Sequence, residues 1–275
     1  FMLVSSQSSI SGLRMAWPVL VFDIESIPDI AGLRALRSAP DDMTDAQVYA
    51  GWVEERKEKG QSDFMPLYLQ RILVISAVFR NADGLRIHSF VDKDDQSEGK
   101  VIQTFFNTLE KHTPQLVSWN GGGFDLPVLH YRGLKHGVVA DKYWDMGEDD
   151  REFKWNNYIS RYHMRHLDLM DLLAMYQPKN NAPLDAMAKL CGFPGKLGMD
   201  GSAVYPAYLD GKLDEIRRYC ETDVMNTYLM YCRFQKMRGG LLDKEYEQEI
   251  GTVRQTLEAL ADTEPHWREY LQVWN

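Results

Sequence analysis

The sequence has few cysteines, and the three that it contains are Cys191, Cys220 and Cys232. They are odd in number, widely spaced and form no C-x-x-C pair, which excludes a disulfide framework and gives no zinc knuckle. We therefore expect three reduced thiols, two of them on one helix. Reduced thiols are typical of a cytoplasmic protein.

Long apolar runs are also missing. Residues 1–17 are rich in serine and hold no apolar stretch long enough for a signal peptide. The longest apolar stretch nearby, Val19 to Phe22, is far too short to cross a bilayer, so we expect no membrane association. The chain begins with Phe1, which makes Met15 a candidate natural start and leaves open whether residues 1–14 are native.

The chain also lacks an excess of basic residues. The chain has 31 Lys and Arg against 40 Asp and Glu, a net charge of −9. Proteins that grip duplex nucleic acid through a broad basic face need the opposite balance. The charge leaves open an action on a polyanion through metal ions that supply positive charge locally.

What is present is a series of short apolar runs separated by helical segments, which predicts one α/β domain on a mixed sheet. Five strands are expected, over 18–24, 71–79, 85–91, 116–119 and the start of 166–173. Helices are expected over 101–111, from Asp125 onward, and over 183–191, 213–237 and 243–260. Residues 29–64 are polar and helix-prone, and we interpret them as a mostly solvated helical insert.

The first candidate functional residues are two acids at the end of the first predicted strand. Asp23 and Glu25 are two residues apart, so on a strand they share a face and can converge on one cation. Two acids that follow a buried apolar strand are costly unless something pairs them. Taken alone, they indicate equally well a strand that has reached solvent.

A second motif is Asn120-Gly-Gly-Gly-Phe124-Asp125-Leu126-Pro127. Its glycines suggest a phosphate loop, but no G-K-[S/T] follows, which speaks against a Walker-type site. We interpret the glycines as a tight turn that lets another backbone approach, and Asp125 as either a helix N-cap or a functional acid.

The third motif is Tyr219-x-x-x-Asp223 within the long predicted helix. Residues four apart lie on one helix face, with a rise of about 6 Å between them. A phenol and a carboxylate in this relation are common on any helix, so the pair means little in isolation.

Together the order strand D-x-E, N-x-x-x-F-D-x-P and helical Y-x-x-x-D resembles the three exonuclease motifs of the DEDD superfamily, and the tyrosine marks the DEDDy subgroup. In particular the chain resembles the stand-alone predicted exonucleases related to the proofreading domain of family B DNA polymerases. The segments P-L-Y-L-Q-R-I-L-V-I-S at 66–76 and H-L-D-L-M-D-L-L at 166–173 are also similar to that family. The resemblance covers roughly residues 17–238.

The resemblance implies a ribonuclease H-like fold, an α/β mixed five-stranded sheet flanked by helices. It places the exonuclease domain over 17–240, with 29–64 as a helical insert, and leaves 241–275 as a C-terminal helical extension packed on the same domain. The implied activity is a two-metal-ion 3′–5′ exonuclease that releases nucleoside 5′-monophosphates from the 3′ end of single-stranded DNA with Mg²⁺ or Mn²⁺. Protein partners are unknown.

Two alternatives stay open. One is the same chemistry on RNA, because DEDDy relatives include RNA-processing enzymes. The other is a catalytically inactive nucleic-acid-binding module on the same fold, which should lack one or more of the acids, whereas this sequence has all of them.

The same resemblance implies a role for each motif residue. Asp23 would bridge both ions. Glu25 and Asp223 would complete the site of the ion that activates water, and Asp125 would help to hold the second ion. Tyr219 would orient the attacking water.

Residues 151–166 depart from the acidic average, with four basic residues and one acid interleaved with aromatic residues. Such a strip suits single-stranded nucleic acid, although its aromatic residues could equally pack on the core. The candidate substrate contacts are Asn120, Phe124, Trp155, Arg161 and Lys196.

Several of these candidates have an alternative reading. Phe124 is either a wedge against the terminal base or a packing residue, and Lys196 is either a phosphate ligand or a solvated loop lysine. One of Asp168 and Asp171 is expected to cap a helix. The pair His163-x-x-His166 lacks a third soft ligand for a transition metal.

Overall fold

The computed structural model describes residues 18–93 and 97–274. The N-terminal segment 1–17, where we expect no signal peptide, and the candidate start Met15 lie outside the described residues. Among the residues that are described, no helix is both long and apolar enough to span a membrane.

A five-stranded sheet forms the centre of the molecule, in the order β3-β2-β1-β4-β5. The strands are β1 (Val19–Pro28), β2 (Gln70–Asn81), β3 (Gly84–Val91), β4 (Gln115–Ser118) and β5 (His166–Asp168). The first three pair antiparallel, whereas β4 runs parallel to β1 and β5 parallel to β4. The predicted mixed five-stranded sheet of a ribonuclease H-like fold is confirmed, and each strand lies where the sequence places it.

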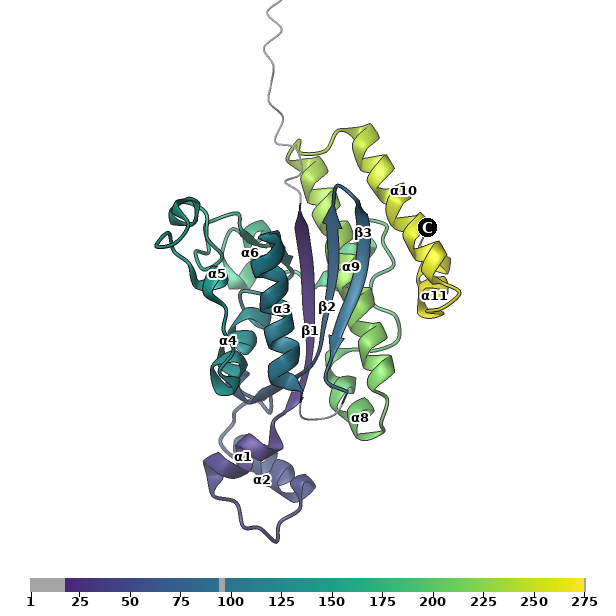
Figure 1. The fold of residues 1–275 in the computed structure, drawn as a ribbon. Helices are drawn as coiled ribbons and strands as arrows, with labels where there is room; N and C mark the ends of the chain where they lie inside the picture. Colours follow the sequence, from purple (N-terminus) through teal and green to yellow (C-terminus); the bar gives the residue numbers. More distant parts are fainter. Residues whose placement is uncertain (1–17, 94–96, 275) are drawn as a thin grey trace, which may run out of the picture.

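Helices cover both faces of the sheet, because the central strand β1 is apolar on both sides. Leu20, Phe22 and Ile24 face the layer formed by α3 (Glu98–His112), α4 (Asp125–His136) and α5 (Asp141–Trp144). The alternate residues Val19 and Val21 face α9 (Leu213–Met237) and its neighbours. Figure 1 shows α3 on one side of the strands and α9 on the other.

The long helix α9 has the bounds that the sequence predicts, and it is buried almost without interruption from Tyr219 to Cys232. Cys220 and Cys232 are free thiols on this one helix, as expected. The predicted helix over 243–260 is α10 (Asp243–Leu260), and it packs on α9. The remaining predicted helices are α6 (Leu169–Leu173) and α7 (Leu184–Leu190).

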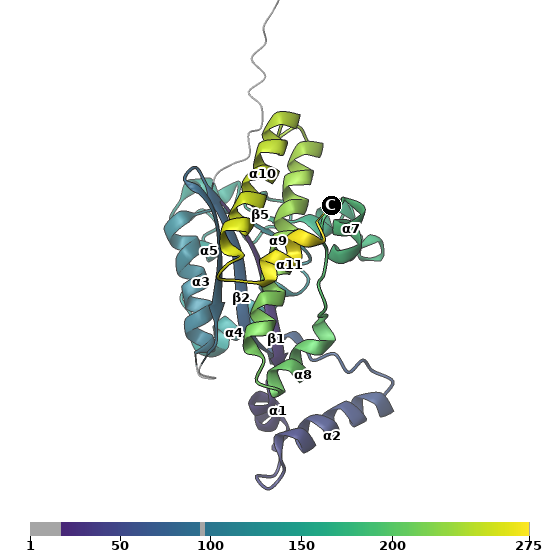
Figure 2. The ribbon, with the colours of Figure 1, turned by 90° about the vertical axis from the view of Figure 1, so that its right-hand side faces the viewer.

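The insert over 29–64 is helical, as predicted, and contains α1 (Ile30–Arg37) and α2 (Asp45–Glu58). Thr44 begins α2 with a capping box, in which its hydroxyl accepts from the Gln47 N–H and the Gln47 side chain accepts from the Thr44 N–H. The two helices share a small apolar cluster with Met65 and Leu69 and project from the end of the sheet (Figures 1 and 2).

Three short helices, α5, α8 (Val204–Leu209) and α11 (His266–Gln272), are missing from our prediction, because four to seven residues give too little periodicity. Four 3₁₀ turns complete the structure, over Leu67–Leu69, Arg151–Lys154, Pro178–Asn180 and Gly201–Ala203. The division at residue 240 stays a prediction.

Candidate active site

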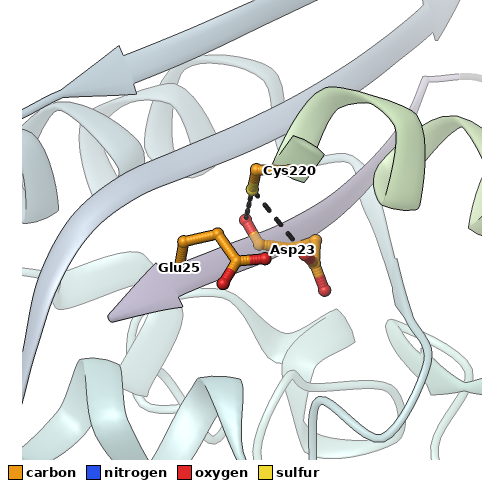
Figure 3. Close-up of side chains that lie close together, drawn as sticks. All are labelled: Asp23, Glu25 and Cys220. Carbon is orange, nitrogen blue, oxygen red and sulfur yellow. Dashed lines mark hydrogen bonds between the residues drawn. The ribbon is translucent and has the colours of Figure 1, made fainter. Parts of the chain in front are cut away.

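The acids of β1 lie on the face of the sheet that α9 covers. Side chains alternate along a strand, so Asp23 and Glu25 follow Val21 on the same face. Donor atoms of Asp23, Glu25 and Cys220 all lie within 4.8 Å of one another, and Figure 3 shows the two carboxylates beside the sulfur that α9 supplies. The strand has not reached solvent here, because Glu25 is buried and Asp23 is partly buried.

Asp125 reaches the same place from the opposite helix layer. Its Oδ1 accepts the backbone N–H of Ile24 at 3.1 Å. Strand β4 pairs with β1 only as far as Val21, so this carboxylate binds an N–H that lies beyond the end of β4. The N-cap of α4 is Phe124, so the reading of Asp125 as an N-cap is wrong: its side chain is turned toward β1 instead.

The third part comes from α9. Asp223 lies one turn after Tyr219, and both side chains are buried. Lys196 Nζ lies 3.2 Å from Asp223 Oδ2 and donates a hydrogen bond to the Tyr219 hydroxyl. The other carboxylate oxygen, Asp223 Oδ1, is buried without a hydrogen-bond partner among the described residues. We call Asp23, Glu25, Asp125 and Asp223 the carboxylate centre.

The carboxylate centre is electrostatically unfavourable by itself. Burial is the main reason that the pKa of Asp23 lies well above its usual value, and repulsion by Asp125, Glu25 and Asp223 adds to it. Burial also raises the pKa of Asp125 to about 7, against hydrogen bonds that lower it. The pKa values of Glu25 and Asp223 are raised by burial too, although Lys196 opposes both shifts.

These residues fit a divalent cation. Four clustered carboxylates with raised pKa values and one orphaned oxygen form a set of hard oxygen donors, which is the set that Mg²⁺ and Mn²⁺ prefer. Added positive charge would relieve the repulsion that the fold otherwise has to withstand.

Lys196 belongs to this site, and its reading as a solvated loop lysine is wrong. Asn226 of α9 clamps the loop: its side chain accepts from the Gly195 N–H and donates to the Gly195 carbonyl. Burial lowers the pKa of Lys196, but Asp223, Asp23 and Glu25 outweigh burial and raise it overall, so the ammonium stays charged. Lys196 is separated in sequence from every motif, which is why the motifs alone do not place it.

Cys220 is a neighbour of the site that our sequence reading missed. Its sulfur lies 3.5 Å from the carbonyl oxygen of Asp23 and 3.6 Å from Asp23 Oδ2. Burial raises the pKa of this thiol well above its usual value, so Cys220 stays protonated and can donate to both oxygens. The sequence does place Cys220 directly after Tyr219 on the long helix, and this position was the one indication that it lies near the site.

The glycine loop is a tight turn, as predicted, but side chains rather than another backbone approach it. A Cβ on Gly121 would lie 2.3 Å from Ser118 Oγ, and one on Gly123 would lie 2.5 Å from Asn120 Oδ1. Asn120 adopts a left-handed φ of 68°. Asp168 accepts the N–H groups of Asn120 and Gly122 at 2.9 Å each and also caps α6, so this acid is structural.

The other candidates have contacts with residues outside the carboxylate centre or are exposed. Phe124 is partly buried and its ring lies 6.0 Å from that of Phe64 in the insert. Arg161 donates to both oxygens of Asp171. Trp155 is 76 % exposed.

The strip over 151–166 is only partly what we expected. Phe153 and Tyr158 are fully buried in the core, so a strip formed by all its aromatic residues is wrong. Neither histidine of the H-x-x-H pair shows a metal geometry: His166 Nε2 bonds Ser118 Oγ at 2.9 Å, and His163 Nδ1 accepts the Asn157 N–H.

Comparison with known proteins gives one family. The model described as "Predicted 3′-5′ exonuclease related to the exonuclease domain of PolB" matches residues 62–274. The matched range holds Asp125, Tyr219 and Asp223, whereas Asp23 and Glu25 precede it. No curated protein matches the chain.

Proposed function

The chain belongs to the family of predicted 3′–5′ exonucleases related to the exonuclease domain of PolB, and on that premise we propose a DEDDy-type enzyme for single-stranded DNA. It would remove nucleoside 5′-monophosphates one at a time from the 3′ end. The observation that carries this proposal is the meeting of three buried acids and the partly buried Asp23 with a tyrosine and a lysine, where Asp223 Oδ1 has no hydrogen-bond partner among the described residues.

Asp23, Glu25, Asp125 and Asp223 would hold two divalent cations, Mg²⁺ or Mn²⁺. When bound, such ions would supply a water nucleophile at neutral pH and neutralise charge on the reacting phosphate. The protein contributes the fixed arrangement of the ligands. The Ile24 N–H holds one Asp125 oxygen, and the Cys220 thiol holds Asp23.

Tyr219 would orient the water through its hydroxyl hydrogen. Burial, followed by the charges of Asp223, Glu25 and Asp23, raises the pKa of this phenol, so it stays protonated at neutral pH. A lysine ammonium has donors only, so in the Lys196–Tyr219 contact the phenol oxygen accepts. The phenol hydrogen is then the donor to Asp223, with which Tyr219 shares a hydrogen bond, and it would turn to the oxygen of an incoming water once a cation binds that carboxylate.

Lys196 has a second effect in this arrangement. Its charge lies against Asp223 and favours the ionised form of that carboxylate, which is the form that binds a cation. Lys196 would thus prepare Asp223 for the cation and fix the direction of the Tyr219 hydrogen bond.

The net charge of −9 supports a substrate that is held at its end. A chain without a basic excess gains little from coating a duplex, whereas cations at the site attract a single 3′-terminal phosphodiester. A cytoplasmic location and DNA rather than RNA as substrate are parts of the proposal.

The test is degradation of 5′-labelled single-stranded DNA and RNA of the same sequence, with EDTA, Mg²⁺ or Mn²⁺. We expect a ladder that shortens from the 3′ end only with a cation. The variant Asp23→Ala should lose at least about 100-fold in rate. Glu247→Ala, which removes an exposed acid of α10, is the matched control and should cleave like wild type.

Four results would count against all or part of the proposal. Cleavage in EDTA, or an unchanged Asp23→Ala rate, would contradict the metal mechanism. No cleavage by wild type under any condition would favour the inactive binding module. Faster cleavage of RNA would replace only the substrate.

A further inference from the structure

A pocket of about 590 Å³ lies beside the carboxylate centre, among α4, α5 and α6 (left part of Figure 1). Asn120, Gly122 and Gly123 line it, and these residues belong to the loop that delivers Asp125 to its place. The volume is within the range of small-molecule sites, about 300–1,000 Å³. The pocket and the carboxylate centre therefore share one wall.

The lining is rich in flat rings. Four tyrosines and three histidines contribute to it, namely Tyr143, Tyr158, Tyr162, Tyr176, His130, His163 and His166. Tyr143 and Tyr158 are stacked with ring centroids 5.5 Å apart and form the buried floor. Tyr162 is 72 % exposed, and the edge of its ring faces Tyr176 at 5.1 Å, so this pair forms an open rim.

The charges in the lining argue against a phosphate. Arg161 is the one Lys or Arg among the lining residues that the structure describes, and its guanidinium is bound to both oxygens of Asp171. Asp168, the other acid, is bound by backbone N–H groups. His130 and His166 stay neutral near pH 7, because burial lowers the pKa of each to about 4. An uncharged, flat ligand suits this lining best.

The backbone at the rim is strained. Met175 and Tyr176 are consecutive non-glycine residues with left-handed φ values of 53° and 59°. Such a pair persists only where its surroundings fix it, and strain of this kind clusters at ligand sites. Here the strain brings Tyr176 to the mouth of the pocket, where the Arg161 guanidinium lies over its ring at 5.2 Å.

From the volume, the rings, the pairing of Arg161 with Asp171 and the strained rim, we propose that this pocket receives one unpaired nucleobase of the substrate strand. The base would stack on the Tyr162–Tyr176 rim, and its nucleotide would lie on the 5′ side of the one that is cleaved, because the 3′ end occupies the carboxylate centre. The inference rests on the proposed function and adds to it a requirement for a single-stranded tail with a base at one fixed position.

Binding in EDTA tests the pocket without cleavage. The probes are single-stranded DNA 12-mers that carry one 2-aminopurine at successive positions from the 3′ end, because stacking quenches the fluorescence of this base. With wild-type protein we expect one internal position to be quenched far more than its neighbours. Quenching at that position should disappear in Tyr176→Ala and persist in Tyr176→Phe.

Tyr162→Ala serves as a second variant, since this exposed side chain can be removed with little risk to folding. Its affinity for the 12-mer should fall about 5- to 150-fold, the range of a lost base–aromatic stack. Tyr131→Ala removes another exposed aromatic residue, which lies outside the pocket, and should bind like wild type.

Uniform quenching, no quenching, or quenching that is the same in Tyr176→Ala and wild type would overturn the base pocket. Cleavage of the unmodified 12-mer with Mn²⁺ is measured beside it and tests the proposed function separately. An active enzyme without position-dependent quenching refutes the pocket alone. An inactive protein that shows the quenching refutes the exonuclease alone.

Discussion

Two groups of acids in this protein have opposite electrostatics. In the carboxylate centre, burial raises the pKa of Asp125 to about 7. In the second group, Asp29 and Glu98 both bind the buried Arg132, at 2.6 Å each. Burial acts to raise the pKa of Asp29 as well, but hydrogen bonds from Lys135, Gly32 and Arg132 outweigh it and lower the pKa to about 2. We call Asp29, Glu98 and Arg132 the anchor cluster.

The difference in pKa distinguishes acids that are paired within the fold from acids whose charge is not balanced by the protein itself. The anchor cluster joins the insert, α3 and α4, and it carries its own cation. The carboxylate centre has Lys196 against four acids. Helix α4 takes part in both, since Asp125 is its first residue and Arg132 lies two turns later.

The largest expected effect comes from removing the cation of the anchor cluster. Arg132→Met should lower the free energy of unfolding by about 3–5 kcal/mol, because it deprives two buried acids of the guanidinium that they share. Urea unfolding measures the loss. Stabilisation by Mn²⁺ should persist in this variant, and a loss below about 1 kcal/mol would show that the anchor cluster does little for the fold.

A change of pH should alter the contributions of the two groups to the free energy of unfolding in opposite directions. The folded-state pKa of Asp125 is raised from 3.8 to about 7, so its contribution to stability is present below pH about 4 and is lost as the pH rises through 7. The rise corresponds to at most about 4 kcal/mol. Asp29, with its pKa lowered to about 2, contributes stability above pH about 4 that is lost as the pH falls through 2.

Unfolding in EDTA from pH 2 to 8 checks both windows, with Asp125→Asn as the matched variant for the upper one. The amide keeps an oxygen for the Ile24 N–H but cannot ionise, so the loss of stability toward pH 8 should be smaller than in wild type. Identical pH profiles would mean that ionisation of Asp125 does not lower the free energy of unfolding.

Divalent cations should supply the carboxylate centre with bound positive charge, which the anchor cluster already has in Arg132. Mn²⁺ at 100 times its Kd should stabilise the wild type by about 2.7 kcal/mol. For a chain of this length that is a rise in Tm of roughly 5–10 °C. Thermal unfolding with and without EDTA measures the rise, which should be much smaller in Asp23→Asn. An equal rise in that variant would place the bound cation elsewhere.

The smallest effect is expected at the edge of the anchor cluster. Lys135 also binds Asp29, but its side chain is 46 % exposed. Lys135→Met should therefore cost less than about 1 kcal/mol in urea unfolding, as is usual for ion pairs in contact with water. A loss as large as that of Arg132→Met would mean that exposure does not decide the worth of these pairs.

The sequence predicts those parts of the site that obey a local period. Asp23 and Glu25 share a face because strand side chains alternate, and Tyr219 and Asp223 share one because helix positions four apart do. The strands and long helices follow for the same reason. Contacts between distant segments have no such signal. The sequence suggested Lys196 only as a substrate contact, so its contacts with Asp223 and Tyr219, and the place of Cys220 beside Asp23, came only with the structure.

Asp125 shows a different limit of sequence reasoning. An acid at a helix start predicts a cap equally well, and only the shortness of β4, which frees the Ile24 N–H, turns it toward β1. The sequence left open whether Phe153 and Tyr158 lie on the surface or in the core, because their neighbours are basic. The cation of Arg165 lies over both rings, at 4.3 and 5.9 Å, so a basic neighbour can belong to the core as well.

The wide separation of the motifs along the chain has a consequence for synthesis. Cys220 contacts Asp23 across 197 positions. At about 5–20 residues per second, roughly 10–40 s pass on the ribosome between the two. A nascent chain thus exposes β1 and α4 long before α9 can join them. Any product that stops short of α9 carries Asp23, Glu25 and Asp125 but no Asp223, and by our proposal it would be unable to cut the nucleic acids around it.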